Sequence, residues 1–246
     1  MKLKIIAAIT ALCVSSAVMA ESYQAEISAE YIDWDAMGNA ASLVGEFHFK
    51  PVETANKPLA EAAFLQKSSN VFAAVRSVDF DFTSDNNDVI EAGVEYYVPN
   101  SMLYVAAEVI RTEYGSYSNN DWCTSVGVTP VDGLLIKTNY CHDDGYDANL
   151  QAKYVTQLAG ETALNLEASY AKSDDELSDE DSYSLGADFY FTRKFSLGAT
   201  YEDEYGYSAT GVRSRYFFNE QISLAGAYVD SDFWGDSYTL SAAVRF

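Results

Sequence analysis

The sequence predicts an all-β protein, an antiparallel up-and-down transmembrane β-barrel of about 14 strands, with about twelve as the alternative count. Three observations predict it. Apolar and polar residues alternate with a period of two, a turn recurs about every 16 residues, and short and long connections alternate. Such strands could face a soluble core, but the repetition along nearly the whole chain favours apolar side chains that face lipid.

The first 20 residues have the pattern of a secretory signal peptide. Lys2 and Lys4 precede an apolar run from Ile5 to Val14, and Ala20 offers a small residue for cleavage before Glu21. The run is too short for a membrane-spanning helix. We therefore expect residues 1–20 to be the signal peptide and residues 21–246 to form the barrel as one domain.

The strands are expected to follow one another without an intervening helical period. In each, every second residue of one set is apolar: Tyr23–Tyr31, Ala41–Phe49, Ile90–Val98, Leu103–Val109, Trp122–Val128, Leu134–Tyr140, Leu164–Tyr170, Tyr183–Phe191, Phe195–Tyr201, Ile222–Tyr228 and Tyr238–Phe246. The expected spans are 22–33, 40–51, 70–83, 88–98, 101–114, 121–130, 134–142, 147–158, 161–172, 182–192, 194–204, 207–218, 221–230 and 237–246.

Two places interrupt the pattern. Residues 60–70 fit a separate short strand, an excursion at the barrel end or an extension of the third strand. Near Ser77 the apolar set changes parity, from Val71–Val75 to Val78 and Phe80, which predicts a β-bulge.

Short turns are expected at one end and longer acidic loops at the other, which returns both termini to the short-turn end. Aromatic residues near the strand ends predict belts at both membrane interfaces. The belt candidates are Trp34, Trp122 and Trp234 at the loop end, and Phe49, Phe191, Phe195, Phe218 and Phe246 at the turn end. The expected loops are Asp33–Asn39, Ser84–Asp88, Gly115–Asp121, His142–Asp147, Ser173–Asp181, Asp203–Gly206 and Asp230–Asp236.

The segment Lys57–Ser69 follows a strand like Gly45–Lys50 and a Pro51-Val52 turn. With the signal peptide and the final Phe246, it resembles the putative general bacterial porin family of Gram-negative outer membranes. The resemblance implies an outer-membrane barrel with both termini periplasmic, in contact with lipid and lipopolysaccharide. It implies recognition of the Phe246 strand by the barrel-assembly machinery, passage of small solutes and no catalytic residues. The apolar outer face is compatible with a homo-oligomer, and we expect no long loop inside the lumen.

Strand parity assigns the charged side chains that would line the pore. They would form a hydrated conduit, or they would pair across strands and fill the barrel. The acidic loops favour a mild preference for cations. The pore-lining candidates are Glu26, Glu30, Glu46, His48, Lys50, Arg76, Glu91, Glu95, Glu108, Lys137, Lys153, Glu167, Asp188, Glu202, Arg213, Arg215 and Arg245.

Cys123 and Cys141 are candidates for a disulfide. A three-residue loop from Val131 to Gly133 would place Pro130 opposite Leu134, and the two cysteines would then lie opposite each other. The periplasm is oxidising, so this register predicts a cross-strand disulfide. A four-residue turn would misalign the pair by one residue and leave free thiols.

Other chemistry finds little support. The net charge of −22 argues against a nucleic-acid partner. Neither His48 nor His142 has a serine at a matching strand position, and the acidic residues after Cys141 lack calcium-loop spacing. We expect no enzyme, no metal and no cofactor. Two hypotheses remain: a porin for small hydrophilic solutes and ions, or a non-conducting barrel that acts as adhesin, receptor or structural protein through acidic extracellular loops.

Overall fold

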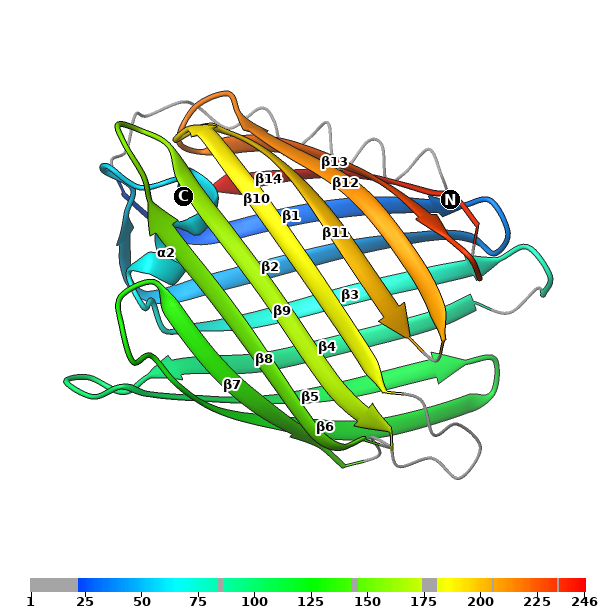
Figure 1. The fold of residues 1–246 in the computed structure, drawn as a ribbon. Coiled ribbons are helices and arrows are strands. Elements are labelled where there is room, and N and C mark those ends of the chain that lie inside the picture. Colours follow the sequence, from blue (N-terminus) through cyan, green and yellow to red (C-terminus); the bar gives the residue numbers. More distant parts are fainter. Residues whose placement is uncertain (1–21, 84–85, 143–145, 174–180, 205, 234) are drawn as a thin grey trace.

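A computed structural model describes residues 22–246 except 84–85, 143–145, 174–180, 205 and 234, so the expected signal peptide lies outside the described residues. Fourteen antiparallel strands form a closed barrel, as predicted (Figure 1). The strands are β1 Ser22–Trp34, β2 Gly38–Glu53, β3 Asn70–Phe80, β4 Asn86–Tyr97, β5 Leu103–Tyr114, β6 Tyr117–Val128, β7 Leu134–Cys141, β8 Tyr146–Gln157, β9 Ala163–Ser173, β10 Ser182–Thr192, β11 Phe195–Glu204, β12 Tyr207–Phe217, β13 Ile222–Ser231 and β14 Ser237–Arg245.

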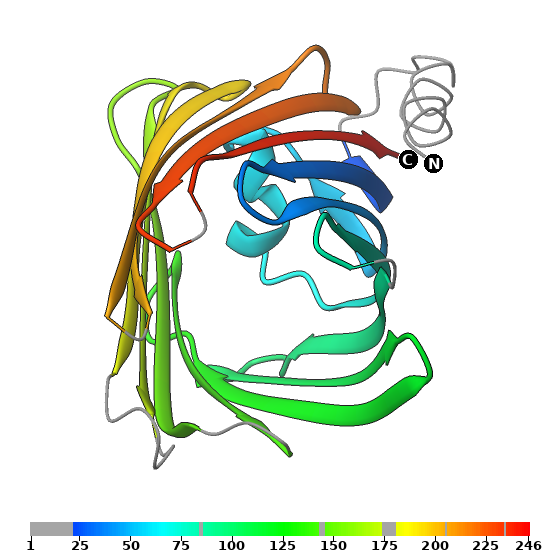
Figure 2. The ribbon, with the colours of Figure 1, turned by 90° about the vertical axis from the view of Figure 1, so that its right-hand side faces the viewer.

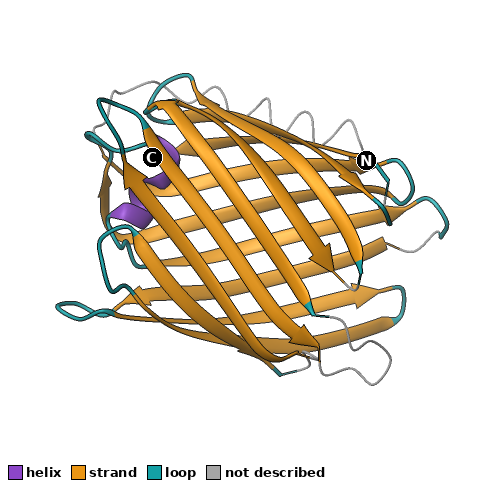
Figure 3. Cartoon of the chain, in the orientation of Figure 1, coloured by secondary structure: helices purple, strands orange, loops and turns teal. Residues whose placement is uncertain are grey.

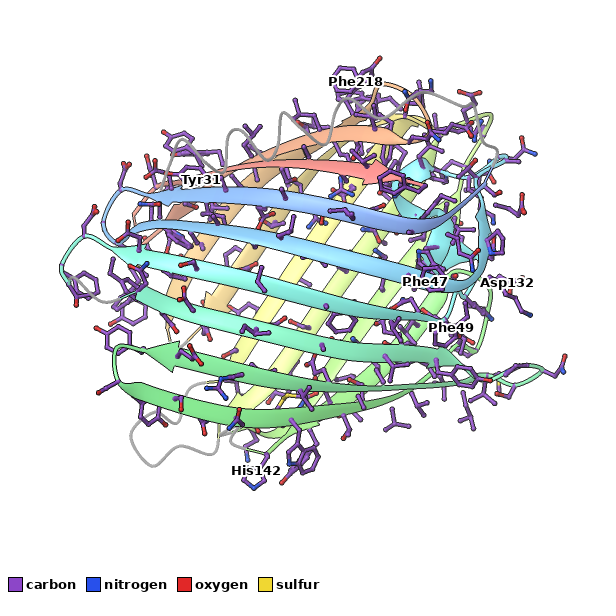
Figure 4. All side chains as sticks on the ribbon, turned by 180° about the vertical axis from the view of Figure 1, so that it is seen from behind. Tyr31, Phe47, Phe49, Asp132, His142 and Phe218 are labelled. Atoms are coloured by element: carbon purple, nitrogen blue, oxygen red, sulfur yellow. A yellow bond between two sulfur atoms is a disulfide. The ribbon has the colours of Figure 1, made fainter. Side chains whose placement is uncertain are left out.

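The outer face of the barrel is apolar, because alternate side chains of every strand point outward. Leu185 is 56% exposed and Val109 is 59% exposed, although both sit in the middle of strands. In Figure 4, Phe47 and Phe49 lie near the end of the barrel where the chain terminates, and Tyr31 lies near the opposite end. A band of this kind requires a lipid cover. Other exposed members are Leu43, Val75, Ile90, Val126, Leu150, Leu197, Val212 and Leu240.

The sheet is weakest where β7 meets β8. Their backbones pair only from Leu134 to Lys137, whereas β7 pairs with β6 from Ile136 to Cys141. Beyond Lys137 the side chain of Asn149 replaces the ladder: its Oδ1 accepts the Asn139 N–H at 2.8 Å and its Nδ2 donates to the Asn139 carbonyl at 2.5 Å. The amide therefore satisfies backbone groups that the diverging strands would leave unpaired.

Several connections are shorter than the sequence predicted. The expected loop 115–121 is only the turn Gly115-Ser116, because Tyr117–Asn120 pair with Arg111–Tyr114. Asp203 and Glu204 likewise belong to β11. The alternation of apolar and polar residues ends before the backbone pairing of the strands ends. Strands that project into water can be polar on both faces while their hydrogen-bonded pairing continues.

The β-bulge expected near Ser77 is absent. β3 keeps one register with β2 and with β4 along its length, so Val78 and Phe80 face the lumen rather than lipid. The change of parity in the sequence therefore reflects apolar side chains, Val78 and Phe80, that point into the lumen, and it does not reflect a change of register. Register shifts occur instead between Tyr23 and Ala25, and in β8 and β10.

Residues 54–69 fold into the barrel at the end where the chain terminates, and we call them the inner segment (Figures 2 and 3). It contains the 3-10 helix η1 Leu59–Glu61 and the short helix α2 Ala62–Leu65. Leu59 and Ala62 are fully buried, and Ala62 packs with Tyr23 and Val52. The expectation that no loop enters the lumen is thus wrong. Among the described residues, no helix has the length and apolar composition needed to cross a bilayer.

Candidate functional site: the barrel lumen

Glu61 fixes the inner segment to the far side of the lumen. Its carboxylate is 5% exposed; it accepts the Tyr190 hydroxyl at 2.7 Å and lies 2.9 Å from Lys153 Nζ. A buried carboxylate needs such partners, because desolvation without them is costly. Glu61 is not among the predicted pore-lining residues, because a residue outside the strands carries no parity signal.

Two arginines hold the backbone of the inner segment. Arg245 donates to the Leu59 carbonyl at 2.8 Å and also pairs with Glu26. Arg193 donates to the Thr54 carbonyl at 2.6 Å and the Lys57 carbonyl at 3.1 Å. These carbonyls belong to a segment without a sheet partner, so the guanidinium groups supply donors that a neighbouring strand would otherwise provide, and the Thr54 carbonyl also accepts the Lys57 N–H at 3.4 Å.

Nearby, a hydroxyl contacts a buried histidine. Ser68 Oγ lies 3.2 Å from His48 Nδ1, and Glu46 lies 3.5 Å from His48 Nε2. The sequence prediction considered only strand positions, and the serine that contacts His48 lies outside the strands. Ser68 comes from the inner segment. Its hydroxyl and His48, which is 1% exposed, join the end of that segment to β2.

Charged side chains of β8–β12 form a closed network, which we call the paired wall. Lys153 bridges Glu61 and Glu167, at 2.9 and 3.1 Å. Arg213 bridges Glu167 and Asp188, at 2.9 and 2.6 Å. Asn165 donates to both Glu167 and Asp188. Each ion therefore has at least one partner of opposite charge.

The inward carboxylates of β2–β5 form a different surface, which we call the acidic wall: Glu46, Glu91, Glu95 and Glu108. Within the described chain, none of the four forms an ion pair with a lysine or arginine. Glu95 accepts hydrogen bonds from Asn70 Nδ2 at 3.0 Å and the Tyr104 hydroxyl at 2.5 Å, both neutral donors. Neither donor carries a positive charge that would cancel the charge of the Glu95 carboxylate.

Two cavities lie on either side of the Glu61 bridge. One of about 550 Å³ reaches the acidic wall at Glu46 and Glu95, and one of about 310 Å³ reaches Glu30 and Arg215. Both touch Glu61, Lys153 and Glu167. The contact between Glu61 and Lys153 thus lies between two cavities, both of which are lined by charged side chains.

The other pore-lining candidates lie apart from the bridge. Lys137 borders the larger cavity and lies 5.8 Å from the Tyr104 ring. Lys50 lines a cavity at the end where the chain terminates, and Glu202 lines another with Asp203. Arg76 lies at the opposite end, 5.9 Å from the Trp34 ring.

The cysteines form the predicted disulfide. Cys123 pairs directly with Cys141 in the β6–β7 register, with Cα atoms 4.1 Å apart. The connecting turn contains Gly133 at φ 75°, and a Cβ there would meet the Val155 carbonyl oxygen at 2.1 Å. Only glycine fits at this position. The register that aligns the cysteines is the predicted one, although strand pairing ends at Val128 and Ile136 and the connection between the strands is residues 129–133 rather than three residues.

The expected aromatic belts are only partly present. Trp122 is 44% exposed on the outer face, but Trp34 lines a cavity inside the barrel, so its assignment to a belt is wrong. The expected turn-end phenylalanines are all exposed. Trp234 and most of the acidic loop 173–181 lie outside the described residues, as do Asp143 and Asp144. Across the described part of the chain, no cluster of metal-binding side chains occurs.

Comparisons with known proteins agree with this architecture. The sequence model of the family described as "Putative general bacterial porin" matches residues 1–147 and 129–246. The outer membrane protein Omp33 of Acinetobacter baumannii is 23% identical, with a TM-score of 0.78 over 92% of this chain and 99% of that one. A bacterial polysaccharide outer membrane secretin is 10% identical, with a TM-score of 0.51 over 94% of this chain and 100% of that one. No curated protein matches the sequence.

Proposed function

This chain belongs to the putative general bacterial porin family, and we propose that it is an outer-membrane porin through which small hydrophilic solutes and ions diffuse passively, with a mild preference for cations. The proposal assigns no catalytic step to any residue. The predicted pore-lining side chains would act by charge and by hydration, as polar rings do in other channels.

One observation carries the proposal: cavities of about 550 and 310 Å³ lie inside a closed barrel and are lined by ionised side chains. Small barrels fill their interiors with side chains, whereas barrels of about sixteen strands leave aqueous channels. A fourteen-strand barrel with charged cavities suits water and small polar solutes.

The acidic wall supports the preference for cations. Lys153 and Arg213 of the paired wall already engage Glu167 and Asp188, so their charges largely cancel. The four carboxylates of the acidic wall form no ion pair with a described lysine or arginine, and Lys137 borders the same cavity as Glu46 and Glu95. The excess of carboxylates over lysines along this wall would raise the local concentration of cations in the lumen.

The proposal includes an orientation. Ser22 and Phe246 lie at the end that contains the inner segment. We place that end in the periplasm and the opposite, acidic end outside the cell, beside lipopolysaccharide. The apolar outer face would contact lipid and, in a homo-oligomer, a second copy of the barrel. The strand that ends at Phe246 would be the part recognised by the barrel-assembly machinery.

The test is conductance in planar lipid bilayers. Purified protein is expected to give steady channels, and a KCl gradient is expected to give a reversal potential of the sign set by K⁺ permeation. A reversal potential of the opposite sign would reject the cation preference while leaving the pore intact.

A specific observation favours the second candidate, a non-conducting barrel. The inner segment occupies part of the lumen and is fixed by Glu61, Arg193 and Arg245. If these contacts close the conduit, insertion into the bilayer is electrically silent, and an adhesive, receptor or structural role takes precedence. Liposome swelling with sugars of graded size separates the two candidates without applied voltage.

A further inference from the structure

An apolar cavity lies inside the barrel at the end opposite the termini. It measures about 330 Å³, and two polar residues, Arg76 and Asn87, line it together with the apolar residues Trp34, Met37, Val78, Phe80 and Val89. Ligand pockets in proteins begin at about 300 Å³. The parity change near Ser77 is what creates this cavity, because the constant register of β3 turns Val78 and Phe80 inward.

These side chains do not form a closed core. Val78 is 8% exposed, but Trp34, Phe80 and Val89 remain only partly buried. Apolar surface that faces a hydrated lumen is unfavourable in proportion to the area left in contact with water. A cluster of this kind is stabilised when a molecule with an apolar body covers it.

Arg76 supplies the charge of the cavity. Its guanidinium is exposed and lies 5.9 Å from the centre of the Trp34 ring. No described carboxylate forms an ion pair with it. Asp88, on the neighbouring strand, instead accepts the Ser77 hydroxyl at 2.5 Å on the outer face. By contrast, Arg213 and Arg245 both engage carboxylates.

We propose that this cavity binds small organic carboxylates with an apolar body, such as arylacetates. The carboxylate pairs with Arg76, and the ring packs on Trp34, Val78 and Phe80. A cationic ligand is disfavoured, because Arg76 repels it and no carboxylate lines the cavity. This goes beyond passive diffusion, which needs no binding site, and it makes the cavity a selective place in a lumen otherwise rich in carboxylates.

Tryptophan fluorescence tests the proposal on the full-length barrel in detergent. The chain has three tryptophans, so the W122F/W234F background leaves Trp34 as the reporter. Titration with phenylacetate is expected to give a saturable change. The neutral isostere phenylacetamide and the cation phenethylammonium are expected to bind at least about tenfold more weakly, because they lack the ion pair with Arg76.

Variants locate the interaction. Arg76→Gln is expected to weaken phenylacetate binding about tenfold and to leave phenylacetamide binding unchanged. Val78→Asp places a carboxylate beside Arg76 and should also weaken phenylacetate binding. Arg111→Gln is the matched control, because Arg111 pairs with Glu113 away from the cavity and its loss should change nothing. Circular dichroism checks that each variant folds.

The proposal is overturned if phenylacetate gives no saturable change, if phenylacetamide binds equally well, or if folded Arg76→Gln keeps full affinity. Binding in detergent does not depend on conduction. A barrel that binds phenylacetate but stays silent in bilayers would therefore contradict the proposed function and leave this inference standing.

Discussion

The acidic wall and the paired wall face each other across one lumen, but their carboxylates differ in whether they form ion pairs with lysine or arginine. On the paired wall, Lys153 and Arg213 are each held between two carboxylates. On the acidic wall, Glu95 has only neutral donors, from Asn70 and Tyr104. The difference teaches that charge in a barrel can serve structure on one side and solutes on the other. Paired ions hold the inner segment, and the carboxylates of the acidic wall are the groups on which the proposed cation preference depends.

The two walls meet at β6–β8, where backbone pairing is weakest. β7 shares only four paired positions with β8, and the disulfide fastens its far end to β6. At this boundary, the disulfide and the Asn149 amide therefore supplement a short backbone ladder.

Removal of the disulfide should give the largest change, since it breaks that boundary. For C123S/C141S, we expect the free energy of unfolding to fall by about 3 kcal/mol, because the link closes a loop of sequence separation 18. Urea unfolding in detergent measures it. Reductant should destabilise the parent protein by the same amount and leave the double variant unaffected; an equal response of both proteins would contradict the prediction.

Arg213→Met tests whether the paired wall serves structure. The change leaves Glu167 and Asp188 without their shared cation, and we expect a loss of about 2 kcal/mol, below the cost of a fully buried pair because the arginine is part-exposed. Unfolding in urea measures this too. Arg215→Met, at a cavity-lining arginine that makes no ion pair within the described residues, is the matched control. Equal losses in both variants would remove the distinction.

Glu95→Gln with Glu108→Gln should have the smallest effect on stability and the clearest on permeation. The amide at position 95 keeps one acceptor oxygen, for Asn70 Nδ2, and its NH2 group donates to the Tyr104 hydroxyl in place of the acceptor that is lost, so removal of the two charges should change the free energy of unfolding by about 1 kcal/mol or less. The cation-to-anion permeability ratio should fall roughly twofold. Reversal potentials measure it, with Glu113→Gln as the control, because Glu113 lies beside Arg111 outside the lumen. An unchanged ratio would show that the acidic wall does not set selectivity.

Much of the barrel could be predicted because strand alternation is a local signal. Leu185 faces out and Asp188 faces in by parity alone, and a single turn glycine, Gly133, sets the register that joins Cys123 to Cys141. Local sequence determines these features, since each depends on near neighbours along the chain or across one hairpin.

The rest depends on contacts between distant parts of the chain. Glu61 meets Tyr190 across a separation of 129 residues, and no pattern near residue 61 encodes that partner. The apolar run around Ala62 was the one local indication that this segment is buried, because apolar residues outside the strands must pack against other protein surface to avoid water. At Val78 alternation misled, because an apolar side chain can face a lumen cavity as well as lipid.

The contacts of Arg245 carry a consequence for the order of assembly. This arginine belongs to β14, the last strand to be synthesised, yet it holds Glu26 of the first strand and the Leu59 carbonyl. The inner segment therefore cannot complete its docking until the two ends of the chain have joined. The same side chain therefore links the closing strand pair to the inner segment, so a change at Arg245 would weaken both contacts together.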